Sequence, residues 1–240
     1  VDEYTYLGVP FTPTLDLEYV TKDRNNKGAR ALGKLVPVLS CKSVLLSIRI
    51  QLIKSCLIPV LTYGAELWGM MAQRTDRLQR TLNKALRLIT GSRSKRTVAA
   101  EVLGLEMSIP PIVAIAAAAK ARALAKYRSS ECLIRELVRH PPYGSRLKTW
   151  LTGGRYWMKS FAGEALRVAS PQDRAKMVRL LVWTRVVATG VKQKATLANY
   201  ETRCLSESRV YLKAEKRFPK STKGIGWLLR IRTGGFWSGQ

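Results

Sequence analysis

The sequence predicts a mostly α-helical protein, with a helical bundle, then a helical linker domain, and a short extended segment at the N-terminus. Residues 40–69 are apolar at nearly every turn, which is typical of a buried helix. Residues 75–90 place apolar side chains at three-to-four spacing, and Gly91 can end that helix. Only residues 1–20 alternate in the manner of a strand.

Composition indicates a folded protein with a polyanionic partner. The 240 residues are 46% hydrophobic, and 42 Lys and Arg stand against 16 Asp and Glu, a net charge of +26. Such an excess suits nucleic acid or an anionic membrane surface. Residues 1–100 carry 16 basic and 7 acidic groups (net +9), and residues 101–240 carry 26 and 9 (net +17), so the excess is not one charged tail.

Metal and membrane signals are weak. The four cysteines show no C-x-x-C spacing and the sequence has one histidine, so no zinc-ligand set is visible and no cofactor is predicted. Thiols of this kind fit an intracellular, reducing compartment. The longest uncharged apolar run, 109–119, is too short to cross a bilayer, so no membrane partner is predicted.

The N-terminal third begins with a predicted strand and loop over residues 1–20. A helix is expected over 21–39, with apolar side chains at three-to-four spacing. Ser40 or Ser43 can cap the central helix that follows. Pro59 is expected to break or kink that helix, because proline lacks the N–H of the hydrogen-bond ladder.

The helix over residues 75–90 has two opposed stripes. One is apolar and consists of Leu78, Leu82, Ala85, Leu86 and Ile89; the other is basic and consists of Arg77, Arg80, Lys84 and Arg87. At about 100° per residue these stripes lie on nearly opposite faces. An ordinary solvated face mixes both signs of charge, and the basic stripe contains no acid. The pattern therefore favours nucleic-acid contact over a merely solvated face.

The rest of the chain is predicted to be helical with two irregular segments. The first is a basic loop over 91–97, and the second is a Gly-, Pro- and aromatic-rich linker over 140–156. Ser170 and Pro171 form a good helix start. Helices are expected at 97–104, at 110–128 with a close-packing alanine run, at 131–139, at 171–189, and within 192–217. Residues 224–239 are rich in Gly and Trp.

No arrangement of residues predicts catalysis. The acids are scattered, without the paired carboxylates that hold two metal ions for phosphoryl transfer. His140 lies at a predicted helix end and is interpreted as a C-terminal cap. Glu66, the one acid of the apolar centre, is expected to pair with a core arginine or cap a helix.

Several short motifs occur in a fixed order along the chain. They are Tyr6-Leu7-Gly8-Val9; Pro59 to Trp68, with Tyr63, Gly64 and Glu66; Leu78, Gln79, Asn83, Leu86, Arg87, Ile89 and Gly91; Glu101, Leu105, Pro110 and Pro111; and Leu228 to Gly234. This succession resembles the region that follows the palm in non-LTR (LINE-type) retrotransposon reverse transcriptases, and it covers most of the chain.

The resemblance implies a thumb over residues 1–92 and a helical connection over 93–240. The parent would be an RNA-directed DNA polymerase that requires Mg²⁺, with this part gripping RNA and an RNA–DNA or DNA duplex beside an upstream palm domain. The implied location is nuclear with a cytoplasmic phase. The candidate nucleic-acid-binding residues are Arg49, Lys54, Arg77, Arg80, Lys84, Arg87, Arg93, Lys95, Arg96, Arg230 and Arg232.

The sequence departs from that family at both ends. The catalytic aspartates of the family's [FY]-x-D-D turn and its C-terminal Cys/His motif have no match here, so this chain is expected to be inactive alone, as a cut fragment or a degenerate copy. Two other interpretations stay open: a stand-alone basic helical RNA-binding accessory protein, and a structural scaffold whose cations keep it in solution.

Overall fold

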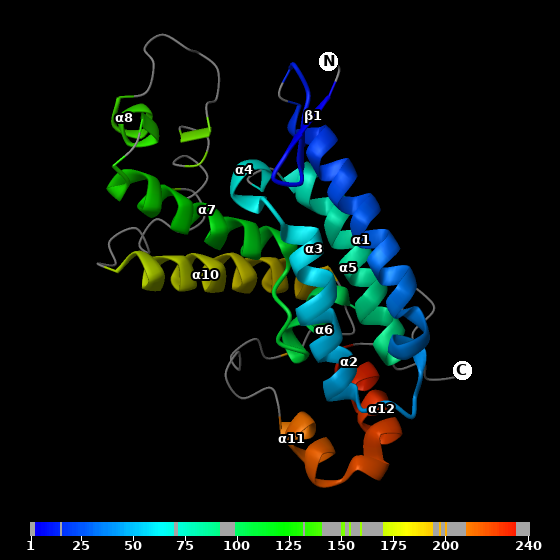
Figure 1. Cartoon of the computed structure of the whole chain (residues 1–240). Coiled ribbons are helices and arrows are strands. Elements are labelled where there is room, and N and C mark those ends of the chain that lie inside the picture. Colours follow the sequence, from blue (N-terminus) through cyan, green and yellow to red (C-terminus); the bar gives the residue numbers. More distant parts are fainter. Residues whose placement is uncertain are drawn as a thin grey trace. The chain divides into compact units, whose positions relative to one another are not determined.

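A computed structural model describes residues 3–14, 16–69, 72–91, 99–131, 133–140, 150–151, 154, 159, 170–193, 197, 200 and 210–233. This part of the chain is mostly α-helical, with one two-stranded sheet at the N-terminus (Figure 1). The predicted fold class is therefore confirmed. None of the described helices is long and apolar enough to span a membrane.

The N-terminal strands form a tight antiparallel hairpin. Strand β1 (Tyr4–Tyr6) pairs with β2 (Val9–Phe11), and Tyr6 lies opposite Val9. The two connecting residues, Leu7 and Gly8, have φ angles of 47° and 76°. Two positive φ angles are what a type I′ hairpin turn requires, and glycine adopts such an angle without steric cost.

Helix α1 (Leu17–Ser40) begins four residues earlier than predicted. The side chain of Asp16 accepts a hydrogen bond from the backbone N–H of Glu18 at 2.8 Å, and the Thr12 hydroxyl accepts one from the Asp16 N–H at 3.0 Å. Asp16 is therefore a side-chain cap that satisfies one of the unpaired N–H groups of the first turn.

The central helix has three parts: α2 (Leu46–Leu52), the π-helical turn η1 (Ile53–Leu57) and α3 (Ile58–Thr62). In η1 the N–H of Ile58 donates to the carbonyl of Ile53, five residues back. The prediction that Pro59 breaks or kinks the helix agrees with this irregularity: a π turn directly before the proline interrupts the regular α-helical hydrogen bonds, and α3 begins with Pro59 in its first turn. The helix ends at Tyr63, which is extended, and at Gly64, whose φ is 69°.

The predicted serine caps of this helix are wrong. Leu45 is the N-cap residue and makes no side-chain cap bond. Ser40 instead belongs to the last turn of α1, where its hydroxyl donates to the carbonyl of Val36 at 2.7 Å. The first N–H groups of α2 are satisfied from a distant part of the chain, described below.

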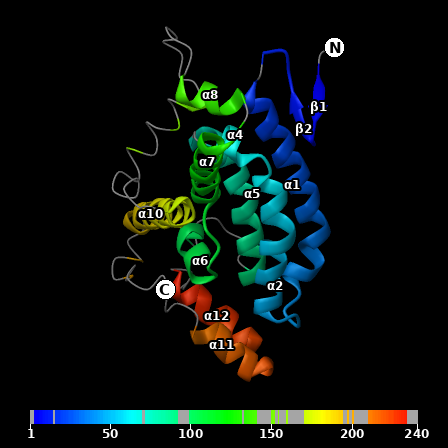
Figure 2. The same cartoon turned by 60° about the vertical axis from the view of Figure 1, so that its left-hand side comes forward.

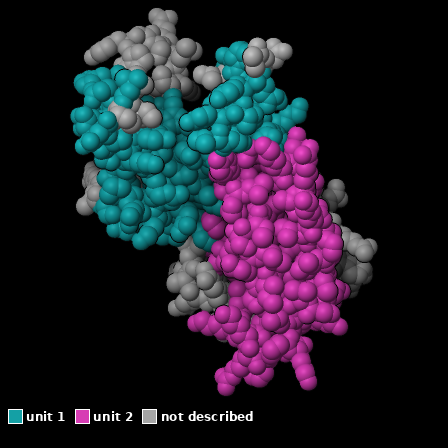
Figure 3. Space-filling model, in the orientation of Figure 1, with its two compact units in different colours: residues 1–23, 64–76, 112–183 teal, residues 24–63, 77–111, 184–240 magenta. Residues whose placement is uncertain are grey.

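The chain divides into two compact units (Figure 3). Unit 1 comprises residues 1–23, 64–76 and 112–183, and unit 2 comprises residues 24–63, 77–111 and 184–240. Each unit is built from three segments, so neither follows the predicted boundary at residue 92. That boundary concerned functional parts of the chain and stays a prediction.

Within unit 2, the described parts of α1, α3 and α5 (Ala72–Thr90) run side by side in both views (Figures 1 and 2). A Cβ atom added at Gly28 of α1 would lie 2.2 Å from a Leu61 methyl carbon of α3, so only glycine permits this approach. Thr81 of α5 donates from its hydroxyl to the Asn25 side-chain oxygen of α1 at 2.9 Å. These contacts tie the three helices together.

In unit 1, small residues bring α4 (Ala65–Trp68) against α7 (Ile112–Ser129). A Cβ atom added at Gly69 would lie 2.3 Å from that of Ala116, and Ala116, Ala117 and Ala118 are all buried. Burial of the alanine run confirms the predicted close packing. The short helix α8 (Leu133–Arg139) follows.

The other helices of the described residues are α6 (Ala100–Glu106), α10 (Pro171–Lys192), α11 (Val210–Arg217), the 3₁₀ turn η4 (Pro219–Ser221) and α12 (Thr222–Arg232). The predicted cap of α10 is confirmed, because the Asp173 N–H donates to the Ser170 hydroxyl at 3.5 Å. Helix α6 runs two residues past the predicted end at residue 104, so Gly104 lies inside it. Helix α12 occupies part of the Gly- and Trp-rich segment, for which no helix was predicted.

Candidate functional site

The positive charge of the protein is concentrated in unit 2. Its three segments contain 26 Lys and Arg against 5 Asp and Glu, a net charge of +21. Unit 1 contains 16 against 11, a net charge of +5. Because the segments of the two units alternate along the chain, this separation is not visible in a linear count.

The described acids of unit 2 are turned inward. They are Glu101, Glu106 and Glu215; the first is half-buried, and the other two are fully buried. The Glu215 carboxylate accepts hydrogen bonds from the backbone N–H groups of Leu46 at 2.6 Å and Ser47 at 2.8 Å. It thereby caps the N-terminus of α2, where the partial positive charge of the helix favours an anion.

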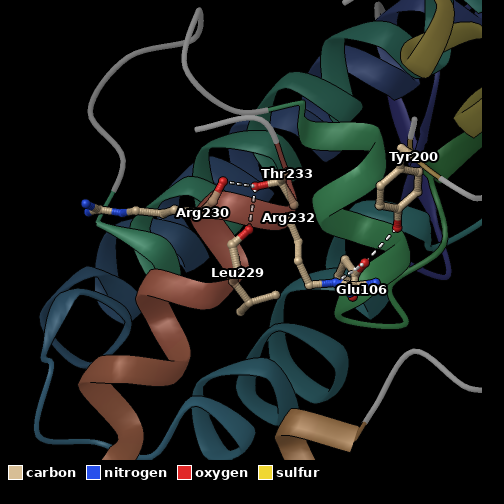
Figure 4. A network of polar contacts seen from close by, with 6 residues as sticks. All are labelled: Glu106, Tyr200, Leu229, Arg230, Arg232 and Thr233. Carbon is tan, nitrogen blue, oxygen red and sulfur yellow. Dashed lines mark hydrogen bonds and ion pairs between the residues drawn. The ribbon is translucent and has the colours of Figure 1, made fainter. Parts of the chain in front are cut away.

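The Glu106 carboxylate is engaged in a second internal network (Figure 4). Its Oε1 accepts hydrogen bonds from the Tyr200 hydroxyl at 2.7 Å and from the Arg232 Nε at 3.0 Å. Burial raises the pKa of Tyr200, and the hydrogen bond to Glu106 raises it further. Among the described residues of unit 2, no acidic side chain is left fully exposed. Asp76, in the part of α5 that belongs to unit 1, is exposed one residue before Arg77.

Helix α5 presents the predicted row of cations. Arg77, Arg80 and Lys84 are exposed, and Arg87 is half-buried. The apolar stripe on the same helix is buried, at 0% exposure for Leu78, Leu82 and Ala85, 1% for Leu86 and 3% for Ile89. The predicted separation of the two faces is confirmed. That the cationic face contacts nucleic acid stays a prediction.

Helix α1 adds cations to unit 2. Lys27, Arg30 and Lys34 are exposed on its C-terminal part, which packs beside α5. Cations distributed over neighbouring helices can contact successive phosphates along a nucleic-acid backbone.

Arg49 occupies a different environment from the one expected. It is 3% exposed, and its Nη1 donates to the carbonyl oxygens of Leu39 at 3.3 Å and Ile89 at 2.9 Å. Burial lowers its pKa, and the negative charge of Glu215 raises it. Arg49 thus neutralises the C-terminal end of α5 inside the bundle. We leave it out of the proposed binding surface.

The other predicted residues differ in how they are placed. Lys54 is half-buried in η1. The side chain of Arg232 is 53% exposed and pairs with Glu106. Arg93, Lys95 and Arg96 lie outside the described residues.

Arg230 links α12 to the end of α5. Its Nε donates to the carbonyl oxygen of Thr90, and its guanidinium carbon lies 5.1 Å from the ring centroid of Trp227. Gly91, whose φ is 65°, ends α5, and a Cβ atom there would lie 2.7 Å from Arg230 Nη2. Glycine at this position therefore serves both the left-handed helix end and the close approach of the arginine.

A cleft of about 100 Å³ opens beside this contact, and we call it the α12 cleft. Trp227, which is 62% exposed, and the exposed cations Lys42 and Lys223 contribute to its wall. The cleft is lined by Ser40, Lys42, Arg49, Leu88, Ile89, Thr90, Gly91, Thr222, Lys223, Gly226, Trp227 and Arg230, all of unit 2. It thus combines an exposed aromatic ring with several cations.

Lys42, Lys223 and Trp227 are not among the residues predicted from the sequence to bind nucleic acid. A signal was present, because Lys223, Trp227 and Arg230 follow one another at spacings of four and three residues, which places them on one face of a helix. It was overlooked because no helix was assigned to that segment.

Unit 1 holds a buried lysine. Lys120 is 2% exposed, and its Nζ lies 3.1 Å from the ring centroid of Trp150. Burial lowers the pKa of Lys120 to about 6, and the negative charge of Glu66 partly opposes that shift. Glu66 therefore acts on a lysine, where the sequence had suggested an arginine or a cap. Its backbone carbonyl accepts a hydrogen bond from the Trp150 indole at 2.8 Å.

Within the described residues, no group of three His, Cys, Asp or Glu side chains could hold a metal ion. No protein family, no curated protein and no solved structure matches this chain.

Proposed function

We propose that this protein binds nucleic acid through the cationic surface of unit 2. The observation that carries the proposal is the separation of charge, with a net +21 in unit 2 and its two fully buried described acids engaged in internal contacts. A surface of one sign attracts a polyanion and repels other cationic surfaces. The row Arg77, Arg80 and Lys84 on α5 is the most regular part of this surface.

Contacts of this kind are to phosphates. Phosphate contacts position a protein on nucleic acid without reading its sequence, and each one makes the affinity depend on salt. We therefore expect strongly salt-dependent binding with little sequence preference along the α5 row.

We further propose the more specific role that the motif order suggests. The chain would be the thumb and helical linker of a non-LTR retrotransposon reverse transcriptase, holding the template–primer duplex and element RNA beside an upstream palm domain. The ordered motifs from Tyr6 to Gly234 support this role, and the exposed cations on α5 are compatible with it. Mg²⁺ would be needed by the parent polymerase, whose location would be nuclear with a cytoplasmic phase.

A charge-matched pair of double variants tests the proposed surface. Arg80→Gln/Lys84→Gln removes two exposed cations, four residues apart, from α5 in unit 2. Arg122→Gln/Lys126→Gln removes two exposed cations at the same spacing from α7 in unit 1. Both variants lower the net charge by two. A difference in affinity between them therefore depends on where the removed cations lie and not on the total charge.

The measurement is the affinity for a short RNA–DNA hybrid at several salt concentrations. The α5 variant should bind more weakly, with a salt slope shallower by up to about two units if both side chains contact phosphate. The α7 variant should stay close to the unchanged protein. Equal losses in both variants would indicate a diffuse charge effect and contradict a defined surface on α5.

The alternatives predict different results in the same titration. A stand-alone RNA-binding protein would prefer RNA hairpins or single strands to the hybrid. A structural scaffold would bind no nucleic acid, or would bind without salt dependence.

A further inference from the structure

We propose that the α12 cleft binds one unpaired nucleotide, whose base stacks on the ring of Trp227 and whose phosphate contacts Lys42 or Lys223. The inference rests on the nucleic-acid binding proposed above for unit 2. It adds the class of ligand at one place on that surface: a single strand or an overhang, as opposed to a fully paired duplex.

The ring of Trp227 is exposed but held. It is 62% exposed, and the Arg230 guanidinium carbon lies 5.1 Å from its centroid. Arg230 is itself fixed through its Nε to the carbonyl of Thr90. An indole that keeps a large part of its surface in solvent, beside an anchored arginine, resembles the stacking platforms that single-strand-binding proteins present to bases.

Position 226, in the lining of the cleft, carries no side chain. A Cβ atom added at Gly226 would meet no atom within 4 Å, so there is room for a larger residue. Glycine inside a helix is less stable than alanine, and packing does not require it here. A larger residue at position 226 would therefore extend from the cleft lining into open space.

The charges of the cleft favour an anion. Lys42 lies in the loop between α1 and α2, and Lys223 lies in the first turn of α12; both are exposed. The C-terminal end of α5 would repel an anion, but Arg49 and Arg230 donate to its last carbonyls. A phosphate at the mouth of the cleft would therefore meet cations.

A base inside a duplex is covered on both faces by its neighbours in the stack. It would have to leave the stack to lie on Trp227, at an energetic cost, whereas an unpaired base has no such cost. The cleft therefore favours single strands. Stacking is tolerant of base identity, because every base has a π face.

The test uses the full chain and three probes of equal length: a thymidine oligonucleotide of about 12 nucleotides, the same backbone with abasic sites, and a blunt duplex. A uridine oligonucleotide forms a parallel RNA arm. Trp227→Ala should lower the affinity for the thymidine and uridine strands by about 5- to 150-fold, the range seen when a stacking aromatic is removed. The affinities for the abasic strand and the blunt duplex should not change. Trp227→Phe should retain most of the affinity, because phenylalanine still stacks.

A second pair of variants fills the cleft without touching Trp227. Gly226→Leu places a side chain in the cleft, and Gly224→Leu places the same side chain in open space on the same helix, outside the cleft lining. Both exchanges favour the helix. Only Gly226→Leu should weaken binding of the thymidine strand. Thermal melting of each variant shows whether it is folded.

The outcomes separate this inference from the proposed function. If the unchanged chain binds none of the probes, nucleic-acid binding by unit 2 fails. If it binds them, but Trp227→Ala lowers the thymidine and abasic affinities equally or not at all, only the stacking site is overturned. Equal effects of Gly226→Leu and Gly224→Leu would also overturn it. So would a Trp227→Ala variant that loses affinity for anionic lipid vesicles while binding the thymidine strand normally, since the cleft would then serve a membrane surface.

Discussion

The carboxylate of Glu215 accepts a hydrogen bond from the backbone N–H of Leu46, 169 positions away in the sequence, at 2.6 Å. The same carboxylate accepts a second bond from the Ser47 N–H. The C-terminal segment thus supplies the cap for the central helix of unit 2. This contact also takes an acid out of the cationic surface.

We predict that Glu215→Ala destabilises unit 2. The buried N–H of Leu46 and the partly buried N–H of Ser47 lose their acceptor. An unsatisfied buried group costs about 1–3 kcal/mol. The free energy of unfolding should be measured by urea denaturation. Glu131→Gln, which also removes one negative charge but at an exposed position, serves as the control and should stay within about ±0.5 kcal/mol. A silent Glu215→Ala variant would show that the cap is dispensable.

Leu82 and Lys84 test the two faces of α5. Leu82 is fully buried and Lys84 is exposed. Leu82→Ala should lower the free energy of unfolding by about 2–5 kcal/mol, because it leaves a cavity in a packed face. Lys84→Ala should change it by no more than about 0.5 kcal/mol. The reverse ranking in thermal melts would mean that the helix is turned the other way.

Lys120 should make stability depend on pH in a defined direction. Its folded-state pKa, lowered to about 6, lies below its ordinary value of 10.5. Between these two values the unfolded chain binds more protons than the folded one, so the contribution of this group to stability rises as pH rises. Lys120→Met should therefore raise the melting temperature of the protein most at low pH. The increase should become smaller towards pH 10.

The melting temperatures of the Lys120→Met variant and of the unchanged protein should be measured from about pH 5 to pH 10. The quantity of interest is the difference between the two melting temperatures at each pH. Lys126→Met, an exposed position on the same helix, is the matched control and should give a constant difference. A constant difference for Lys120→Met as well would show that Lys120 titrates normally.

Tyr200 should produce the opposite dependence at alkaline pH. Its pKa is raised in the folded state by burial and by the bond to Glu106, so above about pH 10 the unfolded chain loses this proton first. That group's contribution to stability is then lost as pH rises. Tyr200→Phe should cost about 1–3 kcal/mol near neutral pH, because Glu106 loses a donor, and should remove this part of the alkaline loss.

Melting curves between about pH 8 and pH 11 measure this effect. Tyr6→Phe, at an exposed position of the hairpin, is the control and should leave the alkaline loss in place. An alkaline loss that is the same in Tyr200→Phe and in the unchanged protein would contradict the assignment to Tyr200.

Local periodicity was sufficient to predict the faces of α5. Because a helix repeats every 3.6 residues, the spacing of Leu78 and Leu82 against that of Arg80 and Lys84 determines which side chains lie together, whatever the helix packs on. The same holds for the Ser170 cap of α10, whose partner is three residues away.

Features that depend on contacts between distant segments could be found only in the tertiary structure. No local pattern shows that Arg49 is buried against Ile89, or that Glu215 caps Leu46, because the partners lie 40 and 169 positions apart. The same reason explains why Trp227 was not recognised as part of a cleft. Its neighbours in that cleft come from α1, from the loop before α2, and from the end of α5.

The distribution of charge shows most clearly what the sequence alone determines and what only the tertiary structure decides. From the sequence alone, the excess of 26 positive charges predicts a polyanionic partner, and its two parts, residues 1–100 and 101–240, carry +9 and +17. The fold sorts the same residues into units of +5 and +21, because each unit is assembled from three alternating segments. Composition determined how much charge this protein carries, and only the packing of distant segments decided where that charge is concentrated.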